Sequence, residues 1–253
     1  MARSKKLATI GDAPLPTERQ GNRGAGRGSE AVSADDMVIP RLQIIQDLSP
    51  QHKKAKSEYI EGAEVKMVFN TATNELYEGP LMVVPILYRK EFIIWRDQDE
   101  GGGFRGSFST ESEAEKARQE LEDCDLCEVV ATNQQFILVV DPDSTMEEPK
   151  AEMATVSMSM SQNKVSRKWN TMIHQVGGDR FDCLYQMEVV DDQNAAGKEY
   201  YNWKVSRKGF ITGTALWNMA EEAYMAISSG RADVSRETAA ASQDSEVAET
   251  EEF

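Results

Sequence analysis

The fold is constrained most by a series of segments with strand periodicity that are rich in Val, Ile, Tyr, Phe and Trp. A period of two places neighbouring side chains on opposite faces of a strand, so that one face can be buried. Segments with this composition or this periodicity cover residues 64–70, 81–96, 153–160, 183–190 and 199–206. In residues 153–160 the alternation is strict, because apolar side chains occupy every second position. The pattern therefore predicts a β-rich chain.

Turn-forming residues predict how some of these strands connect. Residues 191–197 contain Asp, Asn and Gly and predict a hairpin loop between strands 183–190 and 199–206. A second hairpin is predicted within residues 127–140, around Thr132 and Asn133. Pro85 lacks a backbone N–H group and predicts an edge or a bulge in its strand.

Three other segments predict helices, namely residues 111–122, 161–176 and 214–228. Ser109 or Thr110 is available as N-cap of the first helix, and Ser161 as N-cap of the second. Gly177 and Gly230 follow the second and third helices, where glycine commonly ends a helix. The first helix has few apolar residues, which predicts an exposed insertion.

The order of these elements favours a small Greek-key barrel. An OB-fold has five strands with a helix before the last two, and the helix 161–176 precedes the hairpin 183–206 in this way. The sequence thus predicts a β-rich α+β chain with one OB-fold-like barrel over residues 36–230, enlarged by insertions. Another β-rich α+β fold has the same pattern and stays open.

The two ends of the chain are polar and carry opposite charges. Residues 1–30 contain six bases, three acids and a Gly/Arg-rich run, whereas residues 237–253 contain six acids and no base. Both ends have too few apolar side chains to bury, which predicts a disordered leader, residues 1–35, and a disordered tail, residues 231–253. The net charge is −15, so a DNA site has to be a local basic groove on an acidic body.

Several classes of protein are disfavoured by the composition. No stretch has the roughly 18 consecutive apolar residues of a membrane span, and the first residues lack the apolar core of a signal peptide. Three cysteines with irregular spacing predict free thiols in a reducing compartment, the cytoplasm. Two histidines and no nucleophile or phosphate-loop motif predict a protein without enzymatic activity. Cys124 and Cys127 have the spacing of half a zinc site, but plain thiols are favoured, and no metal or cofactor is expected.

Two strands interleave aromatic and basic residues, the combination that single-stranded nucleic acid needs for base stacking and phosphate contact. One is residues 86–96 and the other residues 199–210, and the start of the helix 161–176 adds further bases. The alternative for each aromatic is a place in the core. The candidate DNA-binding residues are Tyr88, Arg89, Lys90, Phe92, Trp95, Arg96, Lys164, Arg167, Lys168, Tyr201, Trp203, Lys204, Arg207 and Lys208.

The last residues form an acidic tip that ends on an aromatic: Asp244, Glu246, Glu249, Glu251, Glu252 and Phe253. This tip resembles the C-terminal tails of bacterial and phage single-stranded DNA-binding proteins. Residues 37–210, including the stretch 158–169, are similar in overall pattern to phage-encoded single-strand binders. The resemblance implies an OB-fold that binds single-stranded DNA, and a tail that recruits a polymerase, helicase or primase through its terminal Phe.

We therefore expect a sequence-independent single-stranded DNA-binding protein of phage replication or recombination. Two other functions fit the same residues. A phage structural or scaffolding protein would self-assemble without preferring single-stranded DNA, and an acidic DNA mimic would bind a basic host protein instead of DNA.

Overall fold

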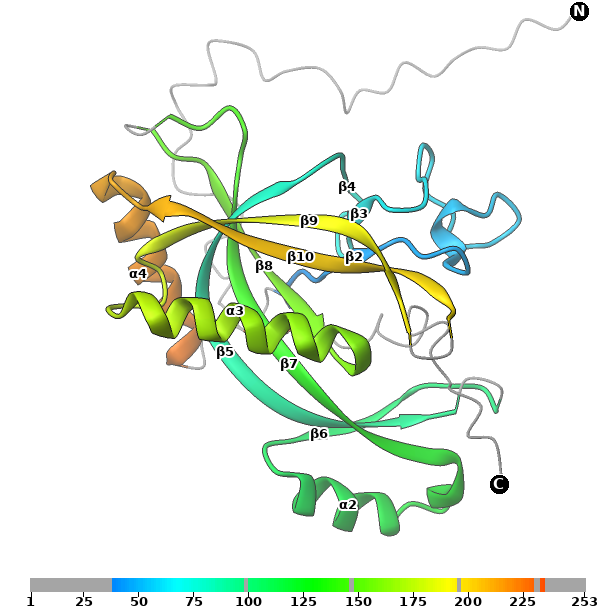
Figure 1. The fold of residues 1–253 in the computed structure, drawn as a ribbon. Helices are drawn as coiled ribbons and strands as arrows, with labels where there is room; N and C mark the ends of the chain where they lie inside the picture. Colours follow the sequence, from blue (N-terminus) through cyan, green and yellow to red (C-terminus); the bar gives the residue numbers. More distant parts are fainter. Residues whose placement is uncertain (1–37, 98–99, 146–147, 195–196, 230–232, 235–253) are drawn as a thin grey trace, which may run out of the picture.

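A computed structural model describes residues 38–97, 100–145, 148–194, 197–229 and 233–234. Its largest element is a six-stranded antiparallel sheet with the strand order β10-β9-β5-β7-β8, in which β6 pairs with β5 (Figure 1). The strands are β5 (Leu81–Arg96), β6 (Phe104–Phe108), β7 (Cys127–Val140), β8 (Ala151–Met158), β9 (Cys183–Gln193) and β10 (Glu199–Phe210). The predicted β-rich α+β class is confirmed by this arrangement.

The long strand β5 belongs to two parts of the sheet. Its first residues, 81–83, pair with β9, its last residues, 92–95, pair with β6, and β7 pairs with it along nearly its whole length. The register between β5 and β7 shifts between Pro85 and Leu87, so the bulge predicted at Pro85 is confirmed. A bulge suits proline because the residue has no N–H group to donate to the ladder.

The sheet does not close into a barrel, so the OB-fold-like barrel expected from the sequence is not what the structure shows. Its outer strands, β8 and β10, are both attached instead to the segment 40–46. Thr155 N in β8 donates to Pro40 O at 2.8 Å. The Gln46 side chain donates to Tyr201 O in β10 at 2.8 Å and accepts from Tyr201 N at 2.9 Å. The backbone of Pro40 and the side chain of Gln46 thus connect β8 and β10, which do not pair with each other.

Two smaller sheets accompany the large one. The first contains β2 (Leu42–Ile44), β3 (Val68–Asn70) and β4 (Leu76–Tyr77), and the second pairs β1 (Val38–Ile39) with β11 (Asp233–Val234) in parallel. β3 is shorter than the strand expected over residues 64–70. The expected leader, residues 1–35, lies outside the described residues, as does the expected tail apart from β11.

The predicted hairpin within residues 127–140 is wrong, because these residues form the single strand β7. Thr132 and Asn133 are 3% and 7% exposed and continue the ladder with β5. Asn133 also accepts a hydrogen bond from the Tyr88 hydroxyl at 2.6 Å. The polar groups of Thr132 and Asn133 suggest a turn when only the local sequence is considered. In the structure, hydrogen bonds to residues distant in sequence satisfy them. The predicted hairpin of β9 and β10 is confirmed.

Helix α2 (Glu111–Gln119) begins with a capping box. Glu113 N donates to Thr110 Oγ1, and the Glu113 carboxylate accepts from Thr110 N, both at 3.3 Å. Thr110 is therefore the N-cap, one of the two residues expected. Ala114 is fully buried against Phe92 and Cys127, so the helix covers a small core of its own and is more than an exposed insertion.

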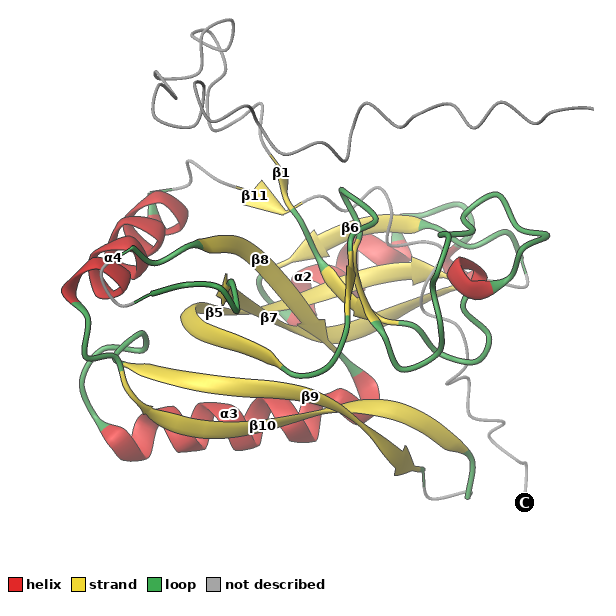
Figure 2. Ribbon diagram, turned by 90° about the horizontal axis from the view of Figure 1, so that it is seen from above, coloured by secondary structure: helices red, strands yellow, loops and turns green. Residues whose placement is uncertain are grey.

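The part of the chain that the structure describes has two further α-helices, α3 (Asn163–Val176) and α4 (Thr214–Ser228). They cover opposite faces of the large sheet (Figures 1 and 2). Side chains of β7 alternate between the two layers, with Ile137 in the α3 cluster and Phe136 in the α4 cluster. α3 begins at Asn163 after a 3₁₀ turn (Met160–Gln162), so the N-cap expected at Ser161 is wrong.

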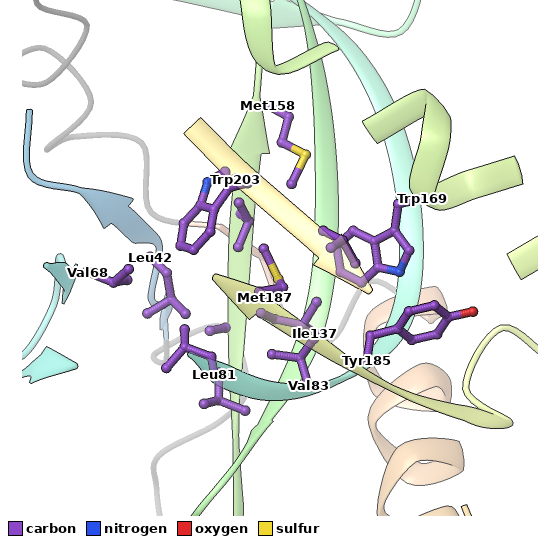
Figure 3. Packing of buried hydrophobic residues seen from close by; sticks show 14 of the residues in the cluster. Leu42, Val68, Leu81, Val83, Ile137, Met158, Trp169, Tyr185, Met187 and Trp203 are labelled. Atoms are coloured by element: carbon purple, nitrogen blue, oxygen red, sulfur yellow. The ribbon is translucent and has the colours of Figure 1, made fainter. Parts of the chain in front are cut away.

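The core under α3 is the larger of the two and fixes the position of this helix (Figure 3). Trp169 is fully buried, and its ring centroid lies 5.8 Å from that of Tyr185 in β9. Trp203 and Met187 complete this layer from β10 and β9. At the end of α3, Gly177 has φ 72°, a conformation that glycine adopts without strain. The helix is thus held along one edge of the β9–β10 hairpin.

Asp182 anchors the connection between α3 and β9. Its carboxylate accepts from Asp179 N at 2.8 Å and from the Trp217 indole N–H at 3.0 Å. Gly178, with φ 81°, lies so close that a Cβ there would overlap this carboxylate. A tight turn with a fixed acceptor therefore joins both helical layers at this point.

Candidate nucleic-acid interface

The predicted stacking residues of β5 are mostly buried. Phe92 and Trp95 are 9% and 6% exposed, and the Trp95 ring packs edge-on against Phe104 at 5.9 Å. Tyr88 is half-buried, and its hydroxyl is already bonded to Asn133. Burial raises the pKa of the Tyr88 hydroxyl. These rings support the fold, and burial removes Phe92 and Trp95 from the set that can stack on a base.

The basic residues of β5 also have partners within the protein. Arg89 lies over the Phe136 ring at 5.2 Å, and the exposed Lys90 lies over Phe92 at 4.8 Å. Arg96 pairs with Asp123 at 3.3 Å. Because β9 separates β5 from β10 in the sheet, the two aromatic-basic strands are not neighbours and do not form one joint site.

The β10 aromatics named by the sequence are likewise tied to the fold. Trp203 is 3% exposed and belongs to the core under α3. Tyr201 is half-buried, and its hydroxyl donates to Asp47 at 3.2 Å while Lys66 lies over its ring at 5.2 Å. Burial therefore removes Trp203 from the set of stacking residues, whereas the half-buried Tyr201 is tied to Asp47 and Lys66 and is only partly available.

The bases of α3, by contrast, are exposed on one stripe. Lys164, Arg167 and Lys168 are spaced by three and four residues, the spacing that brings helical side chains together. Lys164 pairs with Asp192 of β9 at 2.6 Å, whereas no ion pair is found for Arg167 or Lys168 within the described residues. Two of the three charges are thus available for an anionic ligand.

Asp192 connects α3 to the hairpin. Its carboxylate accepts from Lys164, from Asn202 at 2.8 Å and from the Tyr200 hydroxyl at 3.0 Å. Chiefly through Lys164, these donors hold the pKa of Asp192 well below its usual range. The hydrogen bond to Asp192, and less strongly the one to the Tyr200 hydroxyl, raise the pKa of Lys164. The carboxylate therefore stays charged and competes with any phosphate for this lysine.

An open hollow of about 420 Å³ lies between α3 and the β9–β10 hairpin. Its charged lining residues are Lys164, Lys168, Asp191, Asp192 and Lys204. α3 and β10 run side by side in the same direction along it (Figures 1 and 2). Lys204 pairs with Glu188 at 2.6 Å and keeps 59% of its side chain exposed. Farther along β10, Arg207 and Lys208 are exposed.

We name this region the α3–β10 surface and define it by six residues: Lys164, Arg167, Lys168, Lys204, Arg207 and Lys208. All six were identified from the sequence, and the structure places them along one helix and the strand beside it. The six cations are spread over α3 and β10, and Lys204 and Arg207 point to opposite faces of β10, because the strand is regular between them. An extended anion with several charges can contact both elements, whereas a single ion cannot.

A buried polar cluster beneath α3 was missed by the sequence analysis. Arg180 donates to Gln135 and to Asn170, the latter at 2.8 Å, and Gln135 donates to Ser166 at 2.9 Å. Gln135 is fully buried, and burial lowers the pKa of the Arg180 guanidinium to about 10. The cluster joins α3 to β7 and holds the helix that carries the basic stripe. The cluster is recognisable only because its polar side chains are buried, and a sequence pattern does not show which polar residues are buried.

Comparison with known proteins assigns a family. The family described as Pam3 phage gp34-like protein matches residues 8–233. The chain belongs to this family. No curated protein and no solved structure matches it. Membership confirms the phage part of the expected resemblance and leaves single-strand binding as a proposal.

Two further findings concern the described residues. None of their helices is long and apolar enough to cross a membrane. Nor do they contain a group of three or more His, Cys, Asp or Glu side chains placed to hold a metal ion. The predicted partner-binding tail, residues 244–253, lies outside the described residues.

Proposed function

We propose that this member of the Pam3 phage gp34-like family binds single-stranded DNA, without sequence preference and without catalysis, on the α3–β10 surface. The observation that carries the proposal is the group of exposed cations on α3 and β10 of an otherwise acidic chain. A solvated surface of such a chain has no need to gather six bases along one helix and one strand, whereas a polyanion does need them.

The length of the surface suits a short stretch of one strand. The 14 residues of α3 span about 21 Å, because an α-helix rises about 1.5 Å per residue. This length matches roughly six phosphates at the rise of about 3.4 Å per nucleotide that a strand has in duplex DNA, and fewer when a single strand is more extended. A single strand can follow the curved path between a helix and a hairpin. Duplex DNA cannot, because its persistence length is about 150 base pairs.

Four of the six cations have no ion pair within the described residues, namely Arg167, Lys168, Arg207 and Lys208. For single strands each phosphate contact contributes a slope of about −0.7 to the dependence of log K on log salt. Four contacts therefore predict a slope of about −3, or an affinity loss of about 50-fold between roughly 50 and 200 mM salt.

The test is fluorescence anisotropy of a labelled dT oligonucleotide at these two salt concentrations, with a duplex as the competitor. The variant Arg167→Gln/Lys168→Gln removes two contacts and should halve the slope, to about −1.4. The matched control is Lys54→Gln/Lys56→Gln, which removes two exposed charges away from α3. Absence of dT binding by the wild-type chain at low salt, or equal losses in both variants, contradicts the proposal.

The tail fits the same proposal as a regulator and partner site. Its acids and Phe253 would occupy the α3–β10 surface as a phosphate mimic until DNA displaces them and a replication protein captures the tip. Deletion of residues 244–253 should then tighten dT binding, most at low salt. Equal affinities of the full and shortened chains at every salt concentration would exclude this competition.

A further inference from the structure

Phe210, the last residue of β10, is the most exposed large apolar side chain among the described residues, at 59%. Phe210 is not among the DNA-binding residues predicted from the sequence. Single exposed apolar side chains are common on protein surfaces, so the contacts of the Phe210 ring decide whether it has a role.

A bulge in β10 brings Phe210 beside Arg207. Residues three apart point to opposite faces of a regular strand, but the register of β10 shifts between Arg207 and Gly209. Arg207 consequently lies opposite Tyr185 and Phe210 opposite Cys183, and both partners face the core under α3. The Arg207 guanidinium lies 4.6 Å from the centre of the Phe210 ring.

This arrangement leaves one face of the ring for a ligand. Within the described residues no other ring or cation is found against Phe210. Arg207 and its neighbour Lys208 belong to the α3–β10 surface, so a phosphate bound there brings a base within reach of the ring. Stacking on aromatic side chains is tolerant of base identity, as binding without sequence preference requires.

We propose that Phe210, backed by the guanidinium of Arg207, stacks on an unpaired base of the bound strand. The inference rests on the proposed function and adds its stacking residue. It replaces the buried rings of Trp95 and Trp203 in this role. An apolar protein partner is the competing occupant of the ring, and the experiment separates the two.

The experiment compares dT with an abasic oligonucleotide of equal length, which has the same phosphates and no bases. Phe210→Ala should weaken dT binding by about 5- to 140-fold, the range of one base–aromatic stack. Its affinity for the abasic strand should stay within about twofold of wild type. Phe210→Leu keeps an apolar side chain and should lose dT affinity as well, whereas Phe210→Trp should retain it and add a tryptophan emission that dT quenches.

The matched control is Met225→Ala on α4, which removes another exposed apolar side chain, 53% exposed, and should leave both affinities unchanged. Thermal unfolding of each variant verifies that it is folded. Wild-type affinity of Phe210→Ala for dT overturns the stacking role while the charge-based function stands. Equal losses for dT and the abasic strand also overturn it, because they indicate a role in supporting the surface. Failure of the wild-type chain to bind either strand contradicts the proposed function itself.

Discussion

Replacement of Trp203 by alanine tests whether this ring is a core residue or a DNA contact. Trp203 is 3% exposed, lies opposite Val189 and packs in the cluster under α3 with Met187. Truncation of a buried Trp to Ala removes its transfer free energy and leaves a cavity, which together lower the free energy of unfolding by about 3–5 kcal/mol. For a body of this size that corresponds to a midpoint roughly 6–20 °C lower.

Circular dichroism of thermal and urea unfolding measures the loss, and Trp203→Leu serves as the companion variant. Leucine preserves part of the apolar volume, so the stability loss should be smaller and dT affinity in the folded state should match wild type. A base-stacking Trp would behave in the opposite way, with dT affinity about 5-fold or more weaker and unfolding unchanged. That result, or an alanine variant that melts within about 2 °C of wild type, refutes the reasoning that places Trp203 in the core.

Three further predictions concern charge, backbone and capping. Asp192→Asn frees Lys164 and should steepen the salt slope of dT binding by about 0.7. The pKa of Asp192 is lowered in the fold, so the charged carboxylate stabilises the protein above about pH 4 and this stabilisation is lost at lower pH. The free energy of unfolding of the variant, measured with urea, should therefore depend less on pH in acid. Gly79 and Gly178 have φ 79° and 81°. Alanine at Gly79 should lower the free energy of unfolding by about 1–2 kcal/mol, and alanine at Gly178 should lower it more, because its Cβ would overlap the Asp182 carboxylate. Urea unfolding of both variants measures the difference. Thr110→Ala should lower the free energy of unfolding by about 1 kcal/mol through loss of the N-cap, as measured by urea unfolding.

Local signals in the sequence predicted the elements that local chemistry decides. The expected helix 214–228 matches α4, and the glycine pair after Val176 ends α3 where predicted. The β9–β10 hairpin follows from its loop composition. The hairpin expected within residues 127–140 failed because burial of polar side chains in β7 depends on partners in β5 and α3, which no local pattern contains.

The sequence predicted the exposed basic residues of the candidate site, but it did not predict which aromatic side chain is exposed. Lys and Arg keep their charged ends in solvent almost everywhere, so the bases of α3 and β10 are exposed as expected. A period of two shows which aromatics share a face but not which face is core. The bulge before Gly209 then places Phe210 on the same face as Arg207, which a period of two does not predict.

For the proposed DNA binding, the net charge of −15 should lower the association rate more than it weakens the bound complex. At physiological ionic strength charges interact over about 8 Å, so a phosphate on the α3–β10 surface is influenced by its neighbouring lysines and arginines and little by acids on distant parts of the chain. The same acids repel an approaching strand at longer range when salt is low. The association rate should therefore fall less steeply with added salt than for a basic protein, while the dissociation rate carries most of the salt dependence. Stopped-flow measurement at several salt concentrations gives both rates. A steep fall of the association rate with salt would show that repulsion by the acidic body does not control association.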